Sequence, residues 1–191
     1  MASDGRIAGR WRGNPARLLM WGVAAFLLLL PAVAMQLTPA VDWSPGDFVV
    51  MAAMLAMACG TVELGARASP SWAYRSAVGI AVLASFLLVW MNLAAGIIGP
   101  EDDDPANLMF AGVVAVAIAG ALSARCRARG MAGAMAAAAV AQLAVAGVAL
   151  AGDMGAGESV WPWGFAVLNL AYTGAWLSSA WLFRSAARAA G

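Results

Sequence analysis

The stretch MAGAMAAAAVAQLAVAGVALAG, residues Met131–Gly152, decides the fold class of this chain. It contains no charged residue and is about as long as the roughly 20 residues with which an α-helix crosses a bilayer. Strands of a membrane barrel are about ten residues long and alternate between polar and apolar positions, and this stretch has neither property. It therefore predicts a transmembrane helix.

Stretches of this kind recur along the chain. The predicted spans are residues 16–36, 47–66, 76–99, 107–124, 131–152 and 163–183, with prolines in the short connections between them. Of the 191 residues, 63% are hydrophobic and only 11% are charged, whereas soluble domains have about 25% charged residues. We expect an all-α, polytopic transmembrane bundle of six helices that forms one membrane domain over residues 1–191.

The basic residues predict how the bundle is oriented. All eleven are arginines, and they lie before the first span, in the second and fourth connections, and after the last span. The other three connections carry acidic residues and no basic one. The positive-inside rule assigns the arginine-rich side to the cytoplasm. Both termini are therefore expected in the cytoplasm, with the chain in the inner membrane of a bacterium.

The composition disfavours most enzymatic chemistry. The chain has no histidine, the commonest transition-metal ligand and proton shuttle, and it has no glycine-rich phosphate loop or paired-cysteine motif. A formal net charge of +1 gives no reason to expect nucleic acid as a partner. We expect no catalytic residue and no cofactor, and we expect the lipid bilayer as the first partner.

The two cysteines are not expected to form a disulfide. Cys59 lies within a predicted span, and Cys126 lies between Arg125 and Arg127 in a predicted cytoplasmic connection, which is a reducing compartment. An ordinary free thiol is the favoured interpretation of Cys126; a thiol activated by its arginine neighbours is the alternative.

The amino terminus has two interpretations. Residues 1–34 resemble a cleavable signal peptide, because arginines precede the apolar run Leu18–Leu30 and the small-residue motif Ala32–Ala34 follows it. The apolar run is also long enough to remain as a membrane anchor, and we favour retention.

Glu63 is the acidic residue that lies clearly inside an apolar run, with Arg67 four residues later on the same helical face. A carboxylate within the membrane is costly and often functional, for instance as a proton carrier. The alternative, which we favour, is an ion pair with Arg67 or Arg75 that fixes the cytoplasmic end of the second span.

Three amide side chains fall within the spans at similar expected depths. Asn92 and Asn169 are predicted in the outer half of the membrane, and Gln142 lies in the middle of the fifth span. They line an outward-facing polar cavity in one interpretation. In the other, which is more frequent among membrane proteins, they form hydrogen bonds that hold the helices together.

Small residues predict that the fourth and fifth spans pack closely. The fourth span has Ala111, Ala115 and Ala119 at four-residue spacing with Gly112 and Gly120 alongside, and the fifth has Gly133, Ala137, Ala141 and the stretch 144–147. Because burial in water does not drive helix association in lipid, small side chains that allow close approach take its place. We expect these faces to form a tight pair.

The connection after the third span holds four consecutive acids, Glu101, Asp102, Asp103 and Asp104. Such a cluster is a weak candidate for binding a hard cation such as Ca²⁺ or Mg²⁺. It lacks the alternating ligands of a calcium-binding loop, so we favour a solvated loop in which Asp104 or Asn107 caps the fourth helix.

One segment carries a family resemblance. The run Trp90–Gly99 (WMNLAAGIIG), followed by Glu101-Asp102 and by Pro105–Met109 (PANLM), resembles a segment of uncharacterised bacterial multi-pass inner-membrane proteins, and Ala73–Arg75 and Arg129–Ala132 are similar too. The resemblance covers the second to fifth spans. It implies an inner-membrane bundle and no activity, and the acidic run is longer here than in that group.

The sequence thus favours a non-enzymatic accessory or scaffold bundle that associates with itself or with another membrane protein through its small-residue faces. The alternative is a small ion or solute transporter. In that case Asn92, Asn169 and the acidic loop would form the outer entry, and Glu63 would carry a coupling proton.

Overall fold

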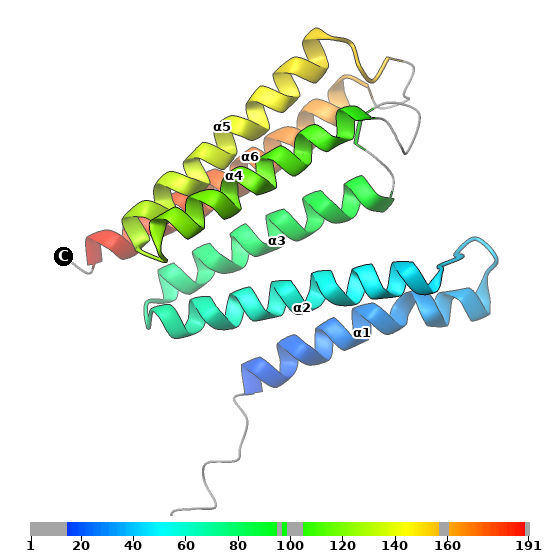
Figure 1. The fold of residues 1–191 in the computed structure, drawn as a ribbon, viewed down its shortest axis with the longest axis horizontal. Coiled ribbons are helices and arrows are strands. Elements are labelled where there is room, and N and C mark those ends of the chain that lie inside the picture. The colour runs from blue at the N-terminus through cyan, green and yellow to red at the C-terminus, as the bar shows by residue number, and fades with distance from the viewer. Residues whose placement is uncertain (1–14, 95–96, 99–104, 157–160, 190–191) are drawn as a thin grey trace, which may run out of the picture. The chain divides into compact units, whose positions relative to one another are not determined.

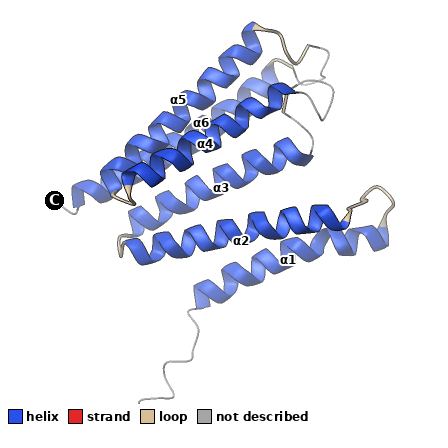
Figure 2. Cartoon of the chain, in the orientation of Figure 1, coloured by secondary structure: helices blue, strands red, loops and turns tan. Residues whose placement is uncertain are grey.

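A computed structural model of the chain consists of helices joined by short connections (Figures 1 and 2). It describes residues 15–94, 97–98, 105–156 and 161–189, and all regular structure within them is helical. The elements are α1 (Pro15–Leu37), α2 (Pro45–Ala68), α3 (Trp72–Ala94), the 3-10 turn η1 (Pro105–Asn107), α4 (Leu108–Ala124), α5 (Ala128–Ala151) and α6 (Trp163–Ala189). The predicted all-α fold with six α-helices is confirmed for the described residues.

Four of these helices, α1, α2, α3 and α5, are long and apolar enough to cross a membrane. Helix α4 is apolar but shorter, at 17 residues, and α6 has 27 residues with a more polar composition. The chain therefore has the character of a membrane protein. That α4 and α6 also cross the bilayer stays a prediction.

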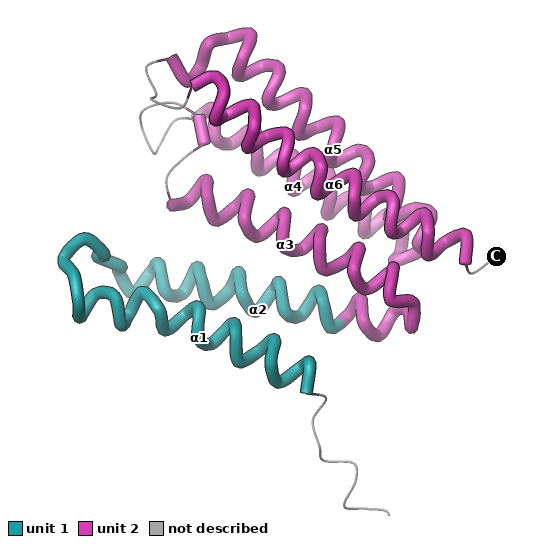
Figure 3. The backbone as a smooth tube through the Cα atoms, turned by 180° about the vertical axis from the view of Figure 1, so that it is seen from behind, with its two compact units in different colours: residues 1–63 teal, residues 64–191 magenta. Residues whose placement is uncertain are grey.

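The chain divides into two compact units, residues 1–63 and residues 64–191 (Figure 3). The boundary falls inside α2, so the first unit contains α1 and most of α2, and the second contains the end of α2 and the helices α3 to α6. That residues 1–191 form a single membrane domain stays a prediction.

In the first unit, local sequence sets where α2 begins. Pro45 occupies the first helical position, where its missing N–H costs nothing. Before it, Ser44 and Asp47 cap each other: the backbone N–H of Ser44 donates to Asp47 Oδ2 at 2.8 Å, and the N–H of Asp47 donates to Ser44 Oγ at 3.3 Å. This reciprocal pair is a capping box.

In the second unit, α5 packs against both α4 and α6, and α6 also packs against α3. Side-chain contacts fix the ends of these helices relative to each other. The Tyr74 hydroxyl on α3 donates to the carbonyl of Cys126 in the α4–α5 turn at 2.9 Å, and the Tyr74 ring meets the Phe183 ring of α6 edge-on at 5.1 Å. Further along, Ser179 Oγ donates to the carbonyl of Ala77 at 2.8 Å.

These contacts gather six arginines at one end of the second unit. Tyr74 joins the start of α3 to the α4–α5 turn and to the last turns of α6. The arginines of these three segments are Arg75, Arg125, Arg127, Arg129, Arg184 and Arg188. The sorting of basic residues that the positive-inside argument requires is therefore present within this unit; which side of the membrane it faces stays a prediction.

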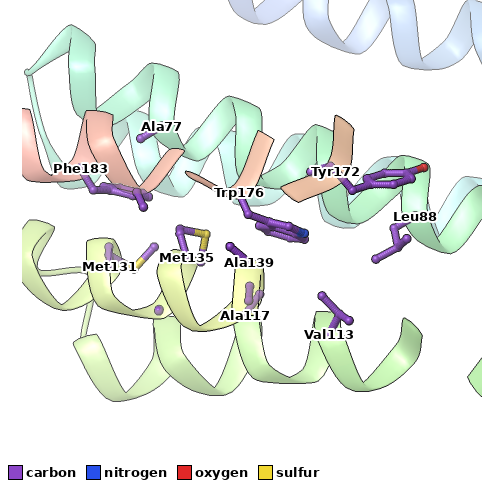
Figure 4. Packing of buried hydrophobic residues seen from close by; sticks show 14 of the residues in the cluster. Ala77, Leu88, Val113, Ala117, Met131, Met135, Ala139, Tyr172, Trp176 and Phe183 are labelled. Atoms are coloured by element: carbon purple, nitrogen blue, oxygen red, sulfur yellow. The ribbon is translucent and has the colours of Figure 1, made fainter. Parts of the chain in front are cut away.

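The core of the second unit is built from a few large side chains set among many alanines. Trp176, Phe183, Leu88 and Val113 are almost completely buried, and Figure 4 shows Trp176 of α6 between Leu88 of α3, Val113 of α4 and Ala139 of α5. The alanines let the helix backbones come close, as expected where packing replaces the hydrophobic effect.

Exposed apolar side chains complete the membrane character. Large hydrophobic residues on the outer faces of both units have more than half of their surface exposed, among them Leu18, Phe26, Val49, Leu122, Val140 and Val167. By contrast, Gln142 and Asn169 are buried. A chain with apolar groups outside and amides inside is suited to lipid as its solvent.

Candidate functional site

Glu63 joins the two helices of the first unit. Its Oε1 forms an ion pair with Arg17 Nε at 2.7 Å and accepts a hydrogen bond from Trp21 Nε1 at 2.7 Å, both on α1. The Glu63 side chain is 17% exposed and that of Arg17 is 58% exposed, so the carboxylate is largely covered while its cation reaches outward. Arg17 and Trp21 are four residues apart and share a helical face, which lets both reach one carboxylate.

The sequence predicts an ion pair of Glu63 with Arg67 or Arg75 at the cytoplasmic end of its helix. The structure provides Arg17 as a partner that sequence reasoning missed. Arg75 instead donates to the carbonyls of Ala66 and Ser69, both at 2.9 Å, and so satisfies the end of α2. The role of Arg67 stays a prediction. The predicted depth of the two residues in the membrane could have suggested Arg17, because Arg17 and Glu63 lie near the same predicted membrane face.

Gln142 and Asn169 form the polar pair at the centre of the second unit. Gln142 Nε2 on α5 donates to Asn169 Oδ1 on α6 at 2.8 Å, and the two residues are 0% and 2% exposed. Asn169 Nδ2 donates to the carbonyl of Phe165 at 2.9 Å, and the Thr173 hydroxyl donates to the carbonyl of Asn169 at 2.8 Å. The structure therefore brings these two predicted polar residues together as an interhelical hydrogen bond.

The orientation of both amides follows from this network. Only an amide nitrogen can donate to the Phe165 carbonyl, so the other terminal atom of Asn169 is its oxygen. Because that oxygen accepts from Gln142, the bonded atom of Gln142 is its nitrogen. The remaining atom of Gln142, Oε1, is thus an acceptor.

Three buried polar atoms have no hydrogen-bond partner within the described part of the chain: Asn92 Oδ1, Gln142 Oε1 and the indole nitrogen of Trp176. They come from α3, α5 and α6 of one unit. A buried polar atom left without a partner costs about 1–3 kcal/mol, so each of them calls for a physical explanation.

Asn92 is placed differently from the other two amides. Its Nδ2 donates to the carbonyl of Leu88 at 2.7 Å, one turn earlier on α3, in the way that Ser85 bonds to the carbonyl of Ala81 at 2.9 Å. It is partly exposed, whereas Gln142 and Asn169 are buried. The outward-facing cavity that would include these three amides stays a prediction.

The close packing of α4 against α5 is confirmed, and Gly120 of the predicted small-residue set lies in the contact, but most of the other predicted residues do not. A Cβ at Gly120 would lie 2.5 Å from Ala134 Cβ, and a Cβ at Gly130 would lie 2.7 Å from Ala124 Cβ, so these glycines form the contact. The predicted residues Ala111, Ala115, Ala119, Gly133 and Ala137 are instead exposed. A helix made almost entirely of small residues carries no sequence signal that distinguishes its faces.

Exposed residues of α5 form a continuous line, which we call the α5 seam: Gly133, Ala137, Val140, Ala144, Gly147 and Ala151. Their spacing alternates between four and three residues, the heptad spacing of paired helices. A Cβ built at Gly133 or Gly147 meets nothing within 4 Å. The seam is therefore a small-residue face open to another helix.

The acidic residues Glu101, Asp102, Asp103 and Asp104 lie outside the described residues. The proposed capping of α4 by Asn107 is wrong, since its side chain makes no capping bond. Asn107 Oδ1 instead accepts from the N–H groups of Ile97 and Ile98 at 2.8 and 2.9 Å, and its Nδ2 donates to the carbonyl of Ile98 at 3.0 Å. In the described residues, no group of three or more His, Cys, Asp or Glu side chains is placed so that it could hold a metal ion.

Both cysteines are free, Cys59 buried and Cys126 exposed. Cys126 and its neighbour Arg125 have left-handed backbone conformations, with φ of 59° and 48°, in the turn between α4 and α5. Cys126 is exposed in this tight turn, which makes it a suitable position for chemical labelling.

Comparison with known proteins finds no match: no protein-family profile, no curated protein and no solved structure is similar to this chain.

Proposed function

We propose that this chain is a non-enzymatic accessory or scaffold protein of a bacterial cytoplasmic membrane, which assembles with a second copy of itself through the α5 seam. The observation that carries the proposal is the exposure of this seam. A face of glycine and alanine lets another helix approach to backbone contact, which is the main source of helix association in lipid.

The length of the seam fits a membrane interface. From Gly133 to Ala151 the helix rises about 27 Å at 1.5 Å per residue, close to the roughly 30 Å of bilayer hydrocarbon. Val140 is the one larger side chain in the line, and it is 67% exposed near the middle. It offers a single knob that a small-residue partner face can accommodate.

A second copy is the occupant that suits the spacing. Copies inserted in the same membrane share one orientation, so a two-fold axis along the membrane normal sets α5 parallel to its counterpart. A heptad spacing keeps two parallel helices in register over their whole length as they coil gently around each other. The α5 seam of one copy would then pack against the α5 seam of the other.

The arrangement of aromatic and basic residues supports six crossings with the arginine-rich end in the cytoplasm. Trp163 and Trp181 on α6 are 80% and 62% exposed and lie 18 residues apart, about 27 Å along the helix axis. Tryptophans gather at both interfaces of a membrane, so this pair would mark the two edges of the hydrocarbon.

The test is energy transfer between labelled copies in liposomes. A fluorophore is attached to Cys126 in a Cys59→Ala background, with donor and acceptor on separate preparations that are mixed before reconstitution. We expect transfer to rise with the protein-to-lipid ratio. Gly147→Leu is expected to weaken association by at least about tenfold, which corresponds to about 1.4 kcal/mol.

The matched control is Gly174→Leu. Gly174 lies on the exposed face of α6, and a Cβ there also meets nothing within 4 Å, so this variant adds the same bulk outside the seam. It should associate like the parent. Transfer at the level of random proximity in the parent, or equal weakening by the two variants, would contradict the proposal.

A small ion or solute transporter is the second candidate. The buried polar atoms of Asn92, Gln142 and Trp176 favour it, because a polar pathway needs such groups within the membrane. A pH-sensitive dye enclosed in liposomes would report proton flux under an imposed membrane potential. Flux in the parent that is lost in a folded Glu63→Gln variant would support transport, and no flux in the parent would support the scaffold.

A further inference from the structure

The buried polar atoms Gln142 Oε1 and Trp176 Nε1 have opposite hydrogen-bonding roles. The network around Asn169 makes Gln142 Oε1 an acceptor, as derived above. An indole nitrogen is a donor only. Each atom lacks a partner within the described residues, and both residues are 0% exposed. One buried donor and one buried acceptor are therefore left over in the same unit.

The two atoms come from helices that pack against each other. In Figure 4, Met131 of α5 lies beside Phe183 of α6, and Ala139 of α5 lies beside Trp176. The indole nitrogen of Trp176 is at the end of the ring directed toward Leu88. Gln142 follows Ala139 by three residues, almost one helical turn further in that direction.

Beside the Gln142–Asn169 pair, the residues around Trp176 are apolar and buried. Leu88 on α3 is 0% exposed, Val113 on α4 is 1% exposed and Ala139 on α5 is 2% exposed. Both residues are 0% exposed, so neither lipid nor bulk water reaches the two atoms, and leaving both without a hydrogen bond would destabilise the folded chain. A small molecule that can both accept and donate removes this destabilisation.

We propose that Gln142 Oε1 and Trp176 Nε1 bind one buried water molecule, which accepts from the indole N–H and donates to the amide oxygen. Buried waters in proteins typically serve polar groups that are otherwise unsatisfied. Water suits the site because the two atoms offer one donor and one acceptor, both buried and without another partner in the described residues. The water joins α5 to α6 next to the direct bond between Gln142 and Asn169.

The test is nuclear magnetic resonance of the full chain in lipid nanodiscs, observing the indole N–H groups. The Trp176 signal is identified by its loss in Trp176→Phe, while the signals of the other eight of nine tryptophans remain. We expect a cross-peak between this N–H and water, and we expect its loss in Gln142→Met, which keeps the side-chain length but removes the acceptor.

Two results would overturn the proposal. One is a Trp176 N–H without any water cross-peak while Trp181, which is 62% exposed, gives one in the same sample. The other is a cross-peak that disappears in Thr173→Val, since the signal would then be relayed by the nearby hydroxyl rather than by water. If Gln142→Met fails to fold, the presence or absence of the water cross-peak at Trp176 in the unmodified chain still tests whether a water molecule is bound there.

Discussion

The contact between α4 and α5 can be tested by adding a single methyl group at Gly120. A Cβ at this position would lie 2.5 Å from Ala134 Cβ and 3.0 Å from Ala134 Cα. Carbon atoms in contact are ordinarily about 3.5–4.0 Å apart. Because one of the two clashing atoms belongs to the backbone, no change of side-chain rotamer relieves the overlap. In Gly120→Ala the helices have to separate by about 1 Å.

The expected magnitude combines two opposing effects. Overpacking of a well-packed contact costs about 1–3 kcal/mol. The higher helix propensity of alanine relative to glycine stabilises the folded state by up to about 1 kcal/mol. Gly112→Ala, on the same helix, gains the same propensity without a clash, because a Cβ there meets nothing within 4 Å. The free energy of unfolding should therefore be about 1–3 kcal/mol lower for Gly120→Ala than for Gly112→Ala.

The assay is reversible unfolding in mixed micelles, with the fraction of sodium dodecyl sulfate raised stepwise and tryptophan fluorescence as the signal. The parent and both variants are compared under identical conditions. Gly120→Ala should unfold at a clearly lower detergent fraction than Gly112→Ala. Equal midpoints for the two variants would show that the α4–α5 interface is not held together at Gly120, and the packing argument would be wrong.

Three further outcomes are expected. Glu63→Gln should lower the free energy of unfolding by about 1 kcal/mol, because its ion pair with Arg17 is only partly covered, and the double variant with Arg17→Leu should lose no more; additive losses would refute the pairing. Asn169→Leu should cost about 1–3 kcal/mol, since it strands the Gln142 amide, and adding Gln142→Leu should recover part of that loss in the same assay. A membrane-impermeant maleimide should label Cys126 in inverted vesicles but not in intact cells, and labelling from outside would reverse the proposed orientation.

Long apolar segments made the helices predictable. The predicted span 131–152 corresponds to α5 at Ala128–Ala151, and the span 163–183 begins where α6 begins, at Trp163. Both signals are local: an uninterrupted apolar run for α5, and Pro162 immediately before α6. The pairing of Gln142 with Asn169 was partly accessible too, because helix geometry places both near one depth.

The faces on which helices meet could not be predicted in the same way. Ala115 and Gly120 are similar in chemistry, yet Ala115 is exposed while Gly120 lies against Ala134. When every side of a helix is small and apolar, the choice of face depends on the three-dimensional fit of its neighbours. Arg17 was missed as the partner of Glu63 for a related reason: the two residues are 46 positions apart, and their contact depends on how α1 lies against α2.

Asn107 gives the chain a place where foreign sequence can be inserted. Its side chain bonds to the backbone of Ile97 and Ile98, so these two residues and η1 are held together by hydrogen bonds of their own. Doubling the length of a closed loop costs only about 0.6 kcal/mol. We therefore expect an epitope tag placed between residues 101 and 104 to leave the helices undisturbed. Binding of an antibody to the tag in intact cells or in inverted vesicles would then show on which side of a native membrane the tag lies.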